Sequence, residues 1–449
     1  MTRLFARFAP LFAVVAFAAC SGPGHSSVTG ASLVPQTKDE LMRHLASSGK
    51  IQHVVIIVQE NRSFDNMFQG YPGADTVPSG KNSKGETITL QPTSLADQYV
   101  IDHSNAAMFS ACNGTGSLPG TDCKMNGFDL EEAYGGPPNP EYVYVPHNES
   151  KPYFEMANEG VLADRMFQSH LDESFISHQY IIAAQAHSGV NLPDGYWGCD
   201  GGPSDQVETI TEQRTIGPSE RACFEYTTLG DELDNAGLSW HFYTSQISGD
   251  GGEWSGYQAV KHIRFGPDWA KDVITPQTQF ITDIQGGYLA NVTWITPICA
   301  NSDHVNCGGG TGPEWVASLV NAIGESPFWN STAIFIMWDD WGGLYDHVPP
   351  PYVDKDGLGF RVPLVIMSPY AKRNKVSHVQ YEHGSILRFA EDQFGLARLA
   401  RSDRRANSPE PDCFDFTKPP RPFKMIKTHG HDLHFFMNQP PDLRAPDYE

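Results

Sequence analysis

The stretch Ile51-Gln-His-Val-Val-Ile-Ile-Val58, followed at once by Gln59-Glu60-Asn61-Arg62, carries the strongest structural signal in this chain. Apolar and mostly β-branched residues run almost without interruption from 51 to 58. Such a run predicts a strand that is buried on both faces of a parallel sheet. The abrupt change to polar residues marks the end of that strand.

Two more apolar runs have the same character. The run at 332–338 ends in Asp339 and Asp340, and the run at 362–367 ends at Ser368. In open α/β sheets, ligands bind beyond the carboxyl ends of the strands, so the polar residues at these ends are candidates for a functional site. Two of the three strand ends carry a pair of oxygen donors.

Helical patterns lie between these runs, at residues 38–48, 154–160, 177–187, 227–236, 314–323 and 383–394. The candidate strands come from both ends of the chain, which favours one α/β domain over two independent domains. We therefore predict a single catalytic domain at 37–449. The Gly-, Pro- and Asn-rich segments 70–150 and 190–225 show little periodicity and are predicted to be long loop insertions.

The first residues have the order of an export signal. Arg3 and Arg7 precede a short apolar run, and Cys20 follows it. The run is too short to span a bilayer core, which needs roughly 20 helical residues. We predict a cleaved signal peptide at 1–19 and a flexible tether at 20–36. The residues before Cys20 resemble a bacterial lipobox, so we expect a lipoprotein in the periplasm or on the cell surface, with simple secretion as the alternative.

An exported chain matures in an oxidising compartment, where cysteines can form disulfides. Three pairs lie close enough in the sequence to close short loops, namely Cys112/Cys123, Cys199/Cys223 and Cys299/Cys307. The spacing favours this pairing without fixing it, and it leaves Cys413 as a spare thiol. No CxxC pair is present, which argues against a structural zinc site.

The composition is that of a folded, acidic protein. The 449 residues include 53 Asp and Glu against 31 Lys and Arg, for a net charge of −22, and 40% of them are hydrophobic. Such a chain can bury a large core. Its negative surface repels phosphate backbones, because binding to polyanions depends on Lys and Arg. Nucleic acid is therefore not expected as a partner.

Four hard oxygen donors stand at two strand ends: Glu60, Asn61, Asp339 and Asp340. Carboxylates neutralise a divalent cation and an amide carbonyl completes its coordination shell. The four residues together favour a metal site, whose metal the sequence does not identify. The competing interpretation is that Asn61 and Asp340 only cap the helices that follow them.

Ser174 lies just before the helical pattern at 177–187. At the first turn of a helix, free backbone N–H groups and the helix dipole favour an anion and lower the pKa of a hydroxyl. Ser174 is therefore the candidate nucleophile, with an N-cap role as the alternative. Ser188 is a weaker rival, because no G-x-S-x-G motif surrounds it.

Three of the 17 histidines follow an Asp directly: His103, His304 and His347. The preceding carboxylate can orient the imidazole ring through a hydrogen bond. These three are the candidates for groups that bind phosphate or transfer protons.

Several motifs resemble those of a known family. The stretch Val58-Gln-Glu-Asn-Arg-Ser-Phe-Asp-Asn-Met-Phe68 is similar to the opening motif of the bacterial acid phosphatase and phospholipase C phosphoesterase family, part of the alkaline phosphatase superfamily. Further matches follow in order at His103, Met125-Asn-Gly-Phe128, 173–180, Ser302-Asp-His304 and 338–351. The resemblance covers roughly residues 50–400.

The resemblance implies a three-layer α/β/α sandwich like that of alkaline phosphatase, and hydrolysis of phosphate esters through a covalent phospho-enzyme. It also implies roles for individual residues: metal ligands at Glu60, Asn61, Asp339 and Asp340, the nucleophile at Ser174, and phosphate-binding or acid groups at His103, His304 and His347.

The expected activity is that of an exported, metal-dependent phosphomonoesterase that acts on a small phosphate ester. The alternative is a phospholipase C that recognises a phospholipid head group. Phosphocholine-specific members of the family resemble one another in using Thr as the nucleophile and in carrying long C-terminal β domains, whereas this chain offers Ser174 and ends soon after the catalytic part. Aromatic residues in the loops at 190–260 either form a choline cage or belong to the core: Trp197, Trp240, Trp254 and Tyr257.

A non-catalytic surface binding protein is the alternative from another class. Such a protein would need no metal and would tolerate the loss of Ser174, but it leaves the paired oxygen donors and the histidines without a purpose. A sulfatase of the same superfamily would need a C/S-x-P-x-R motif, which the sequence lacks.

Overall fold

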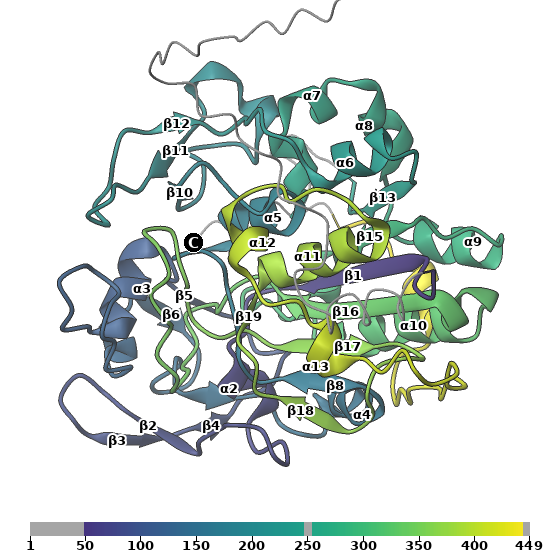
Figure 1. The fold of residues 1–449 in the computed structure, drawn as a ribbon. Helices are drawn as coiled ribbons and strands as arrows, with labels where there is room; N and C mark the ends of the chain where they lie inside the picture. The colour runs from purple at the N-terminus through teal and green to yellow at the C-terminus, as the bar shows by residue number, and fades with distance from the viewer. Residues whose placement is uncertain (1–48, 247–253, 443–449) are drawn as a thin grey trace, which may run out of the picture. The chain divides into compact units, whose positions relative to one another are not determined.

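A computed structural model of the chain describes residues 49–246 and 254–442. Its centre is an eight-stranded sheet with the order β14-β13-β15-β1-β16-β17-β8-β18 (Figure 1). In that order the strands are β14 (Val273–Ile274), β13 (Trp240–Tyr243), β15 (Val292–Ile295), β1 (His53–Gln59), β16 (Thr332–Trp338), β17 (Leu364–Met367), β8 (Val161–Ala163) and β18 (Lys375–Ser377).

The two strands that end in oxygen donors are neighbours. β1 and β16 run parallel, with Gln59 opposite Trp338, and both are buried along nearly their whole length. This confirms the prediction of two buried, parallel strands. Because their carboxyl ends meet at the same edge of the sheet, Glu60 and Asp339 leave the sheet side by side.

The third predicted strand runs in the opposite direction. β17 pairs with β16 in antiparallel orientation. Its carboxyl end therefore lies at the far edge of the sheet, where Ser368 Oγ donates a 2.8 Å hydrogen bond to the carbonyl of Thr332 at the start of β16. The expectation of a parallel strand is wrong here, because a run of apolar residues predicts burial on both faces but not direction.

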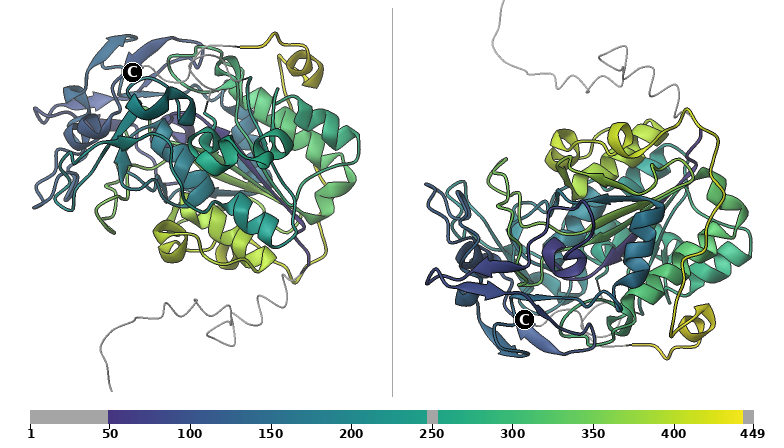
Figure 2. Two further views of the ribbon diagram at one scale, coloured as in Figure 1. Left: turned by 90° about the horizontal axis from the view of Figure 1, so that it is seen from above. Right: turned by 90° about the horizontal axis from the view of Figure 1, so that it is seen from below.

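Helices cover both faces of the sheet (Figure 2). On one face α10 (Gly312–Gly324) packs with α4 (Lys151–Glu159) and α9 (Gln279–Gln285), and on the other α11 (His383–Phe394) packs with α5 (Ser174–Ala183) and α12 (Arg401–Arg405). The predicted three-layer α/β/α sandwich is confirmed. The predicted helices at 154–160, 227–236, 314–323 and 383–394 are present as α4, α6 (Leu229–Asn235), α10 and α11.

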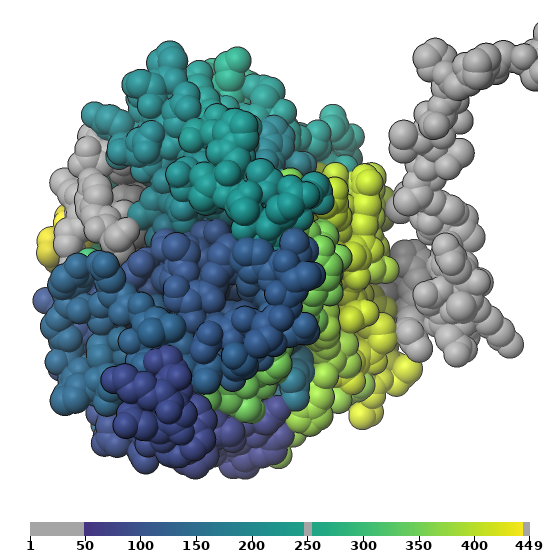
Figure 3. Space-filling model, turned by 90° about the vertical axis from the view of Figure 1, so that its left-hand side faces the viewer, coloured from purple at the N-terminus to yellow at the C-terminus, as the bar shows by residue number. Residues whose placement is uncertain are grey.

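The segments 70–150 and 190–225 contain short elements rather than sheet layers, as their weak periodicity predicts. The first holds β2 (Ser79–Lys81), β3 (Thr87–Thr89), β4 (Gln91–Pro92), β5 (Tyr99–Ile101), α3 (Asn105–Cys112), β6 (Ala133–Gly135) and β7 (Val143–Tyr144), and the second holds β11 (Gln206–Thr209) and β12 (Glu220–Arg221). Figure 3 looks onto the face that they form, with the first segment in purple to blue and the second in teal.

The remaining elements are short. They are α2 (Phe64–Phe68), β9 (Met166–Phe167), β10 (Gly189–Val190), α7 (Lys261–Arg264), α8 (Pro267–Asp272), β19 (Tyr381–Glu382), α13 (Glu410–Cys413) and α14 (Leu433–Met437).

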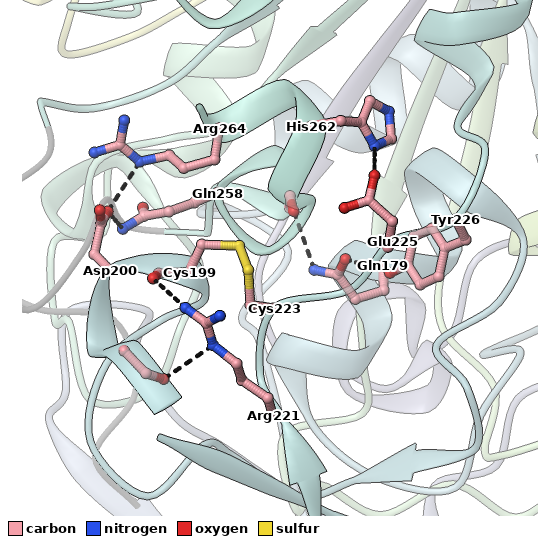
Figure 4. Close-up of a disulfide and its surroundings, with 12 residues drawn as sticks. Gln179, Cys199, Asp200, Arg221, Cys223, Glu225, Tyr226, Gln258, His262 and Arg264 are labelled. Atoms are coloured by element: carbon pink, nitrogen blue, oxygen red, sulfur yellow. Dashed lines mark hydrogen bonds and ion pairs between the residues drawn. A yellow bond between two sulfur atoms is a disulfide. The ribbon is translucent and has the colours of Figure 1, made fainter. Parts of the chain in front are cut away.

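All three predicted disulfides are present: Cys112–Cys123, Cys199–Cys223 and Cys299–Cys307, with Cys413 free and buried. Figure 4 shows the second of them near Gln179 of α5. Gln179 Nε2 donates to the carbonyl of Gly256 at 3.2 Å, and its Oε1 accepts a 2.6 Å hydrogen bond from the Tyr226 hydroxyl. The helix that begins at Ser174 is thereby tied to the segments around this disulfide.

The predictions for the N-terminus lie outside the described residues. They concern the signal peptide at 1–19, the tether at 20–36 with Cys20, and the helix at 38–48. Within the part of the chain that the structure describes, no helix is both long enough and apolar enough to cross a membrane.

The Cys199–Cys223 disulfide joins residues separated by 24 positions. Replacing both cysteines by Ser is expected to lower the free energy of unfolding by about 3 kcal/mol, because the cross-link no longer restricts the unfolded chain. Guanidinium unfolding followed by Trp fluorescence measures the loss, with Cys413→Ala as the control that keeps every disulfide. A loss below about 1 kcal/mol would contradict the expected contribution of this cross-link.

Candidate active site

Four of the predicted site residues form one hydrogen-bonded cluster. Asn61 Nδ2 lies 3.0 Å from Ser174 Oγ, 3.1 Å from Asp340 Oδ2 and 3.1 Å from His103 Nε2. Ser174 Oγ donates to Asp340 Oδ2 at 3.0 Å. All four side chains are fully buried. Residues from four separate parts of the sequence thus meet at the carboxyl ends of β1 and β16.

Glu60 and Asp339 face a histidine that the sequence analysis did not select. His178 Nε2 lies 3.2 Å from Glu60 Oε1 and 3.8 Å from Asp339 Oδ2, and the three ligand atoms lie within 4.8 Å of one another. The backbone N–H of Asn61 donates to Asp339 Oδ1 at 2.9 Å, which joins this group to the first cluster. The available signal was the position of His178, four residues after Ser174 and hence on the same face of a helix.

Ser174 is the first residue of α5, as predicted, although the helix starts before the predicted boundary. The N-cap of α5 is Glu173 and that of α2 is Ser63, so neither Ser174 nor Asn61 serves as a cap. Ser177 Oγ donates to the carbonyl of Asp339 at 2.7 Å and fixes the first turn of α5 against the end of β16. The free N–H groups and the dipole of α5 favour negative charge at this point.

The hydrogen bonds of two histidines define where their protons lie. His304 Nδ1 accepts the backbone N–H of Asn306 at 3.1 Å, so the neutral ring carries its proton on Nε2. His103 Nδ1 lies 2.9 Å from the carbonyl of Ile101, which only accepts, so the neutral ring carries its proton on Nδ1. The ring centroids are 6.2 Å apart. The His304 ring is therefore arranged to donate a hydrogen bond through Nε2, and the His103 ring to accept one through Nε2.

His347 lies in a different group of charged residues. Its Nδ1 is 2.6 Å from Asp65 Oδ2 and its Nε2 is 3.1 Å from Asp75 Oδ1. Arg361 completes the group through hydrogen bonds of 2.8 and 3.0 Å to Asp346. Among the described contacts, none links His347 to Ser174. Burial opposes a charge on the ring, but the hydrogen bond and the charge of Asp65 raise the pKa of His347 above its usual value.

The other candidates lie away from the first cluster. Ser188 lies beyond the end of α5, where its backbone carbonyl accepts the N–H of Ile210 at 2.8 Å. Trp240 and Tyr257 stack at 4.7 Å within the hydrophobic core. Of the four aromatic residues considered for a choline cage, Trp254 is the one that stacks on His304, at a centroid distance of 6.2 Å.

Two buried oxygens test whether the site fits a metal ion. Asn61 Oδ1 and Asp339 Oδ2 have no hydrogen-bond partner among the described residues, although both side chains are fully buried. An unsatisfied buried oxygen costs roughly 1–3 kcal/mol. A divalent cation held by such oxygens removes that cost, and amide and carboxylate donors suit it. The residues present therefore fit a metal centre.

Replacing His347 tests the charged group around it. The raised pKa means that the protonated ring stabilises the fold below its unfolded pKa of about 6.5, and that this contribution is lost as the pH rises through the folded pKa. We expect His347→Gln to lower the free energy of unfolding by about 2 kcal/mol at pH 6 and by less at pH 9. Urea unfolding at both pH values measures this, and equal losses at the two would contradict it.

Comparison with known proteins identifies the family of this chain. The sequence profile of the Phosphoesterase family matches residues 51–397. The protein named phospholipase C B of Mycobacterium tuberculosis is 25% identical over 492 residues, covering 96% of this chain and 88% of that protein. Non-specific phospholipase C1 of Arabidopsis thaliana is 26% identical over 430 residues, covering 81% and 73%.

Among solved structures, a protein in the alkaline phosphatase superfamily from Vibrio parahaemolyticus aligns with 81% of this chain and 72% of its own, at 11% identity and a TM-score of 0.38. The family match spans most of the chain. The protein belongs to the Phosphoesterase family and is a hydrolase that acts on phosphoric ester bonds.

Proposed function

We propose that this protein is a metal-dependent phosphomonoesterase that works through a phosphoserine intermediate. One observation carries the proposal: Ser174 Oγ lies at the start of α5, 3.0 Å from both Asp340 Oδ2 and Asn61 Nδ2, in a fully buried cluster. A serine so placed has a carboxylate to take its proton and a helix N-terminus to stabilise the phosphate.

Glu60, Asn61, Asp339 and Asp340 are the proposed metal ligands, and the unsatisfied oxygens of Asn61 and Asp339 support this assignment. A divalent cation bound there would neutralise the non-bridging phosphate oxygens and lower the pKa of the serine hydroxyl.

The chain's own residues account for the proton transfers. Ser174 Oγ passes its proton to Asp340 Oδ2 and forms a bond to phosphorus, while the bond from phosphorus to the ester oxygen breaks. The Nε2–H of His304 hydrogen-bonds the departing alkoxide, which takes from Asp340 the proton that left Ser174. In the second half-reaction Asp340 takes a proton from water, the water oxygen attacks phosphorus, and Ser174 Oγ recovers that proton from Asp340 as its bond to phosphorus breaks and inorganic phosphate leaves.

A phospholipase C activity is the second candidate, and the names of the relatives favour it. The positions of the aromatic residues favour the monoesterase over a choline-specific enzyme. Trp240 and Tyr257 are stacked in the core, and the indole N–H of Trp197 donates to the carbonyl of Ser255 at 3.2 Å. Trp254 stacks on His304, and Trp197 packs edge-on against His178 at a centroid distance of 6.0 Å, so each of these two rings already pairs with a histidine of the site.

The proposed place of action is outside the cytoplasm. Three disulfides support export, because disulfides persist in oxidising compartments. The proposal includes cleavage of the signal peptide before Cys20 and attachment to the membrane through a lipid on that residue.

The nucleophile assignment is tested with Ser174→Ala. Hydrolysis of p-nitrophenyl phosphate is expected to fall by at least about 1,000-fold, because the variant cannot form the covalent intermediate. The wild type, quenched in acid during turnover, is expected to yield a peptide phosphorylated at Ser174 in mass spectrometry.

Ser188→Ala is the matched control and should keep near wild-type turnover. Activity that survives in Ser174→Ala would overturn the nucleophile assignment. A wild-type preference for p-nitrophenylphosphorylcholine would instead favour the phospholipase C candidate.

The role of His304 predicts a dependence on the leaving group. A hydrogen bond to the leaving oxygen matters most when the leaving alkoxide is a strong base, so His304→Asn is expected to slow glycerol phosphate hydrolysis by about 100-fold or more and p-nitrophenyl phosphate hydrolysis much less. Values of kcat/KM for the two esters measure the difference. Equal losses for both esters would show that His304 acts on the phosphate group and not on the leaving oxygen.

A further inference from the structure

We propose that His178 is a further ligand of the metal centre, and that its nitrogen makes the centre selective for a zinc-like transition-metal ion over calcium and magnesium. The inference rests on the proposed metal-dependent function, since it concerns the ligands of the same ion.

The distances around His178 are those of ligands that share one ion. Two ligand atoms bonded at roughly 2.1 Å to the same ion lie about 3 to 4 Å apart. His178 Nε2 lies 3.2 Å from Glu60 Oε1 and 3.8 Å from Asp339 Oδ2. All three side chains are fully or almost fully buried. Because these side chains are buried, water does not solvate them, and an ion bound between them would take the place of that solvation.

A simple hydrogen bond does not account for this group. A bond between His178 and Glu60 would satisfy that pair, but it leaves Asp339 Oδ2 buried without a hydrogen-bond partner in the described part of the chain. The other oxygen of Asp339 already accepts the N–H of Asn61. The unsatisfied oxygen, Asp339 Oδ2, is the one that faces His178 and Glu60. A positive ion bound at that point would give this oxygen the partner that it lacks.

A nitrogen ligand changes which metal the centre prefers. Calcium and magnesium take oxygen ligands, whereas zinc and its first-row neighbours bind imidazole well. Without His178 the proposed ligands are all oxygens, and both classes of metal fit. With it, α5 supplies a metal ligand one turn after the nucleophile Ser174, so one rigid helix sets the position of both.

Metal competition tests the inference without measuring activity. Protein stripped by a chelator is dialysed against equimolar zinc, manganese, calcium and magnesium, and the bound metals are measured by mass spectrometry. The wild type is expected to take up zinc with almost no calcium or magnesium. His178→Gln is expected to bind zinc about 100-fold more weakly and to lose the preference.

His170→Gln is the matched control. His170 is as deeply buried, but its Nδ1 hydrogen-bonds Asp172 at 2.9 Å. Its replacement should leave metal selectivity unchanged. Circular dichroism shows whether each variant is folded.

X-ray absorption at the zinc edge gives a second, direct measurement on the wild type. Imidazole scattering that is lost in His178→Gln supports the inference. If the variant does not fold, the wild-type spectrum still tests the inference, because a zinc shell made only of oxygen atoms would show that His178 is not a ligand. Unchanged zinc affinity and selectivity in a folded His178→Gln would also overturn it while leaving the metal-dependent function intact. A wild type that binds none of the four metals would overturn both.

Discussion

Parallel pairing of β1 with β16 is the constraint on which the site depends. The register sets Gln59 opposite Trp338, and the pairing continues past the strands, where the N–H of Asp339 donates to the carbonyl of Gln59 at 3.0 Å. Because side chains alternate along a strand, a slip of one residue would send one pair of oxygen donors to the other face of the sheet. The apolar side chains buried on both faces hold this register.

The turn after β16 completes the arrangement. Gly342 lies so close to Asn61 that an added Cβ would sit 2.2 Å from the Asn61 carbonyl oxygen, and its φ of 60° also favours glycine. Its N–H donates to Asp340 Oδ1 at 2.8 Å. Glycine at this position therefore lets the two chain segments approach, and it orients the carboxylate whose other oxygen accepts the Ser174 hydroxyl.

Sequence patterns predict those features of the structure that depend on residues close together in the chain. Burial of β1 and β16, the oxygen donors that follow them, the three disulfides and the helix that begins near Ser174 all follow from local sequence. The direction of β17 does not, because the same apolar run suits either orientation. The surroundings of His347 could not be predicted from the sequence either. The preceding Asp346 suggested a local partner for the ring, but the ring of His347 hydrogen-bonds Asp65 and Asp75, more than 270 positions away. His178 was missed because only its spacing from Ser174 marks it.

The central claim is that the paired strand ends build a metal centre beside the nucleophile. Anomalous diffraction from a metal-loaded crystal tests it most directly. The predicted result is a peak within bonding distance of oxygens from Asn61, Asp339 and Asp340, next to Ser174 Oγ. A peak in the carboxylate and histidine group of Asp65, Asp346 and His347, which also lies close enough together to hold an ion, with none beside Ser174, would contradict the claim.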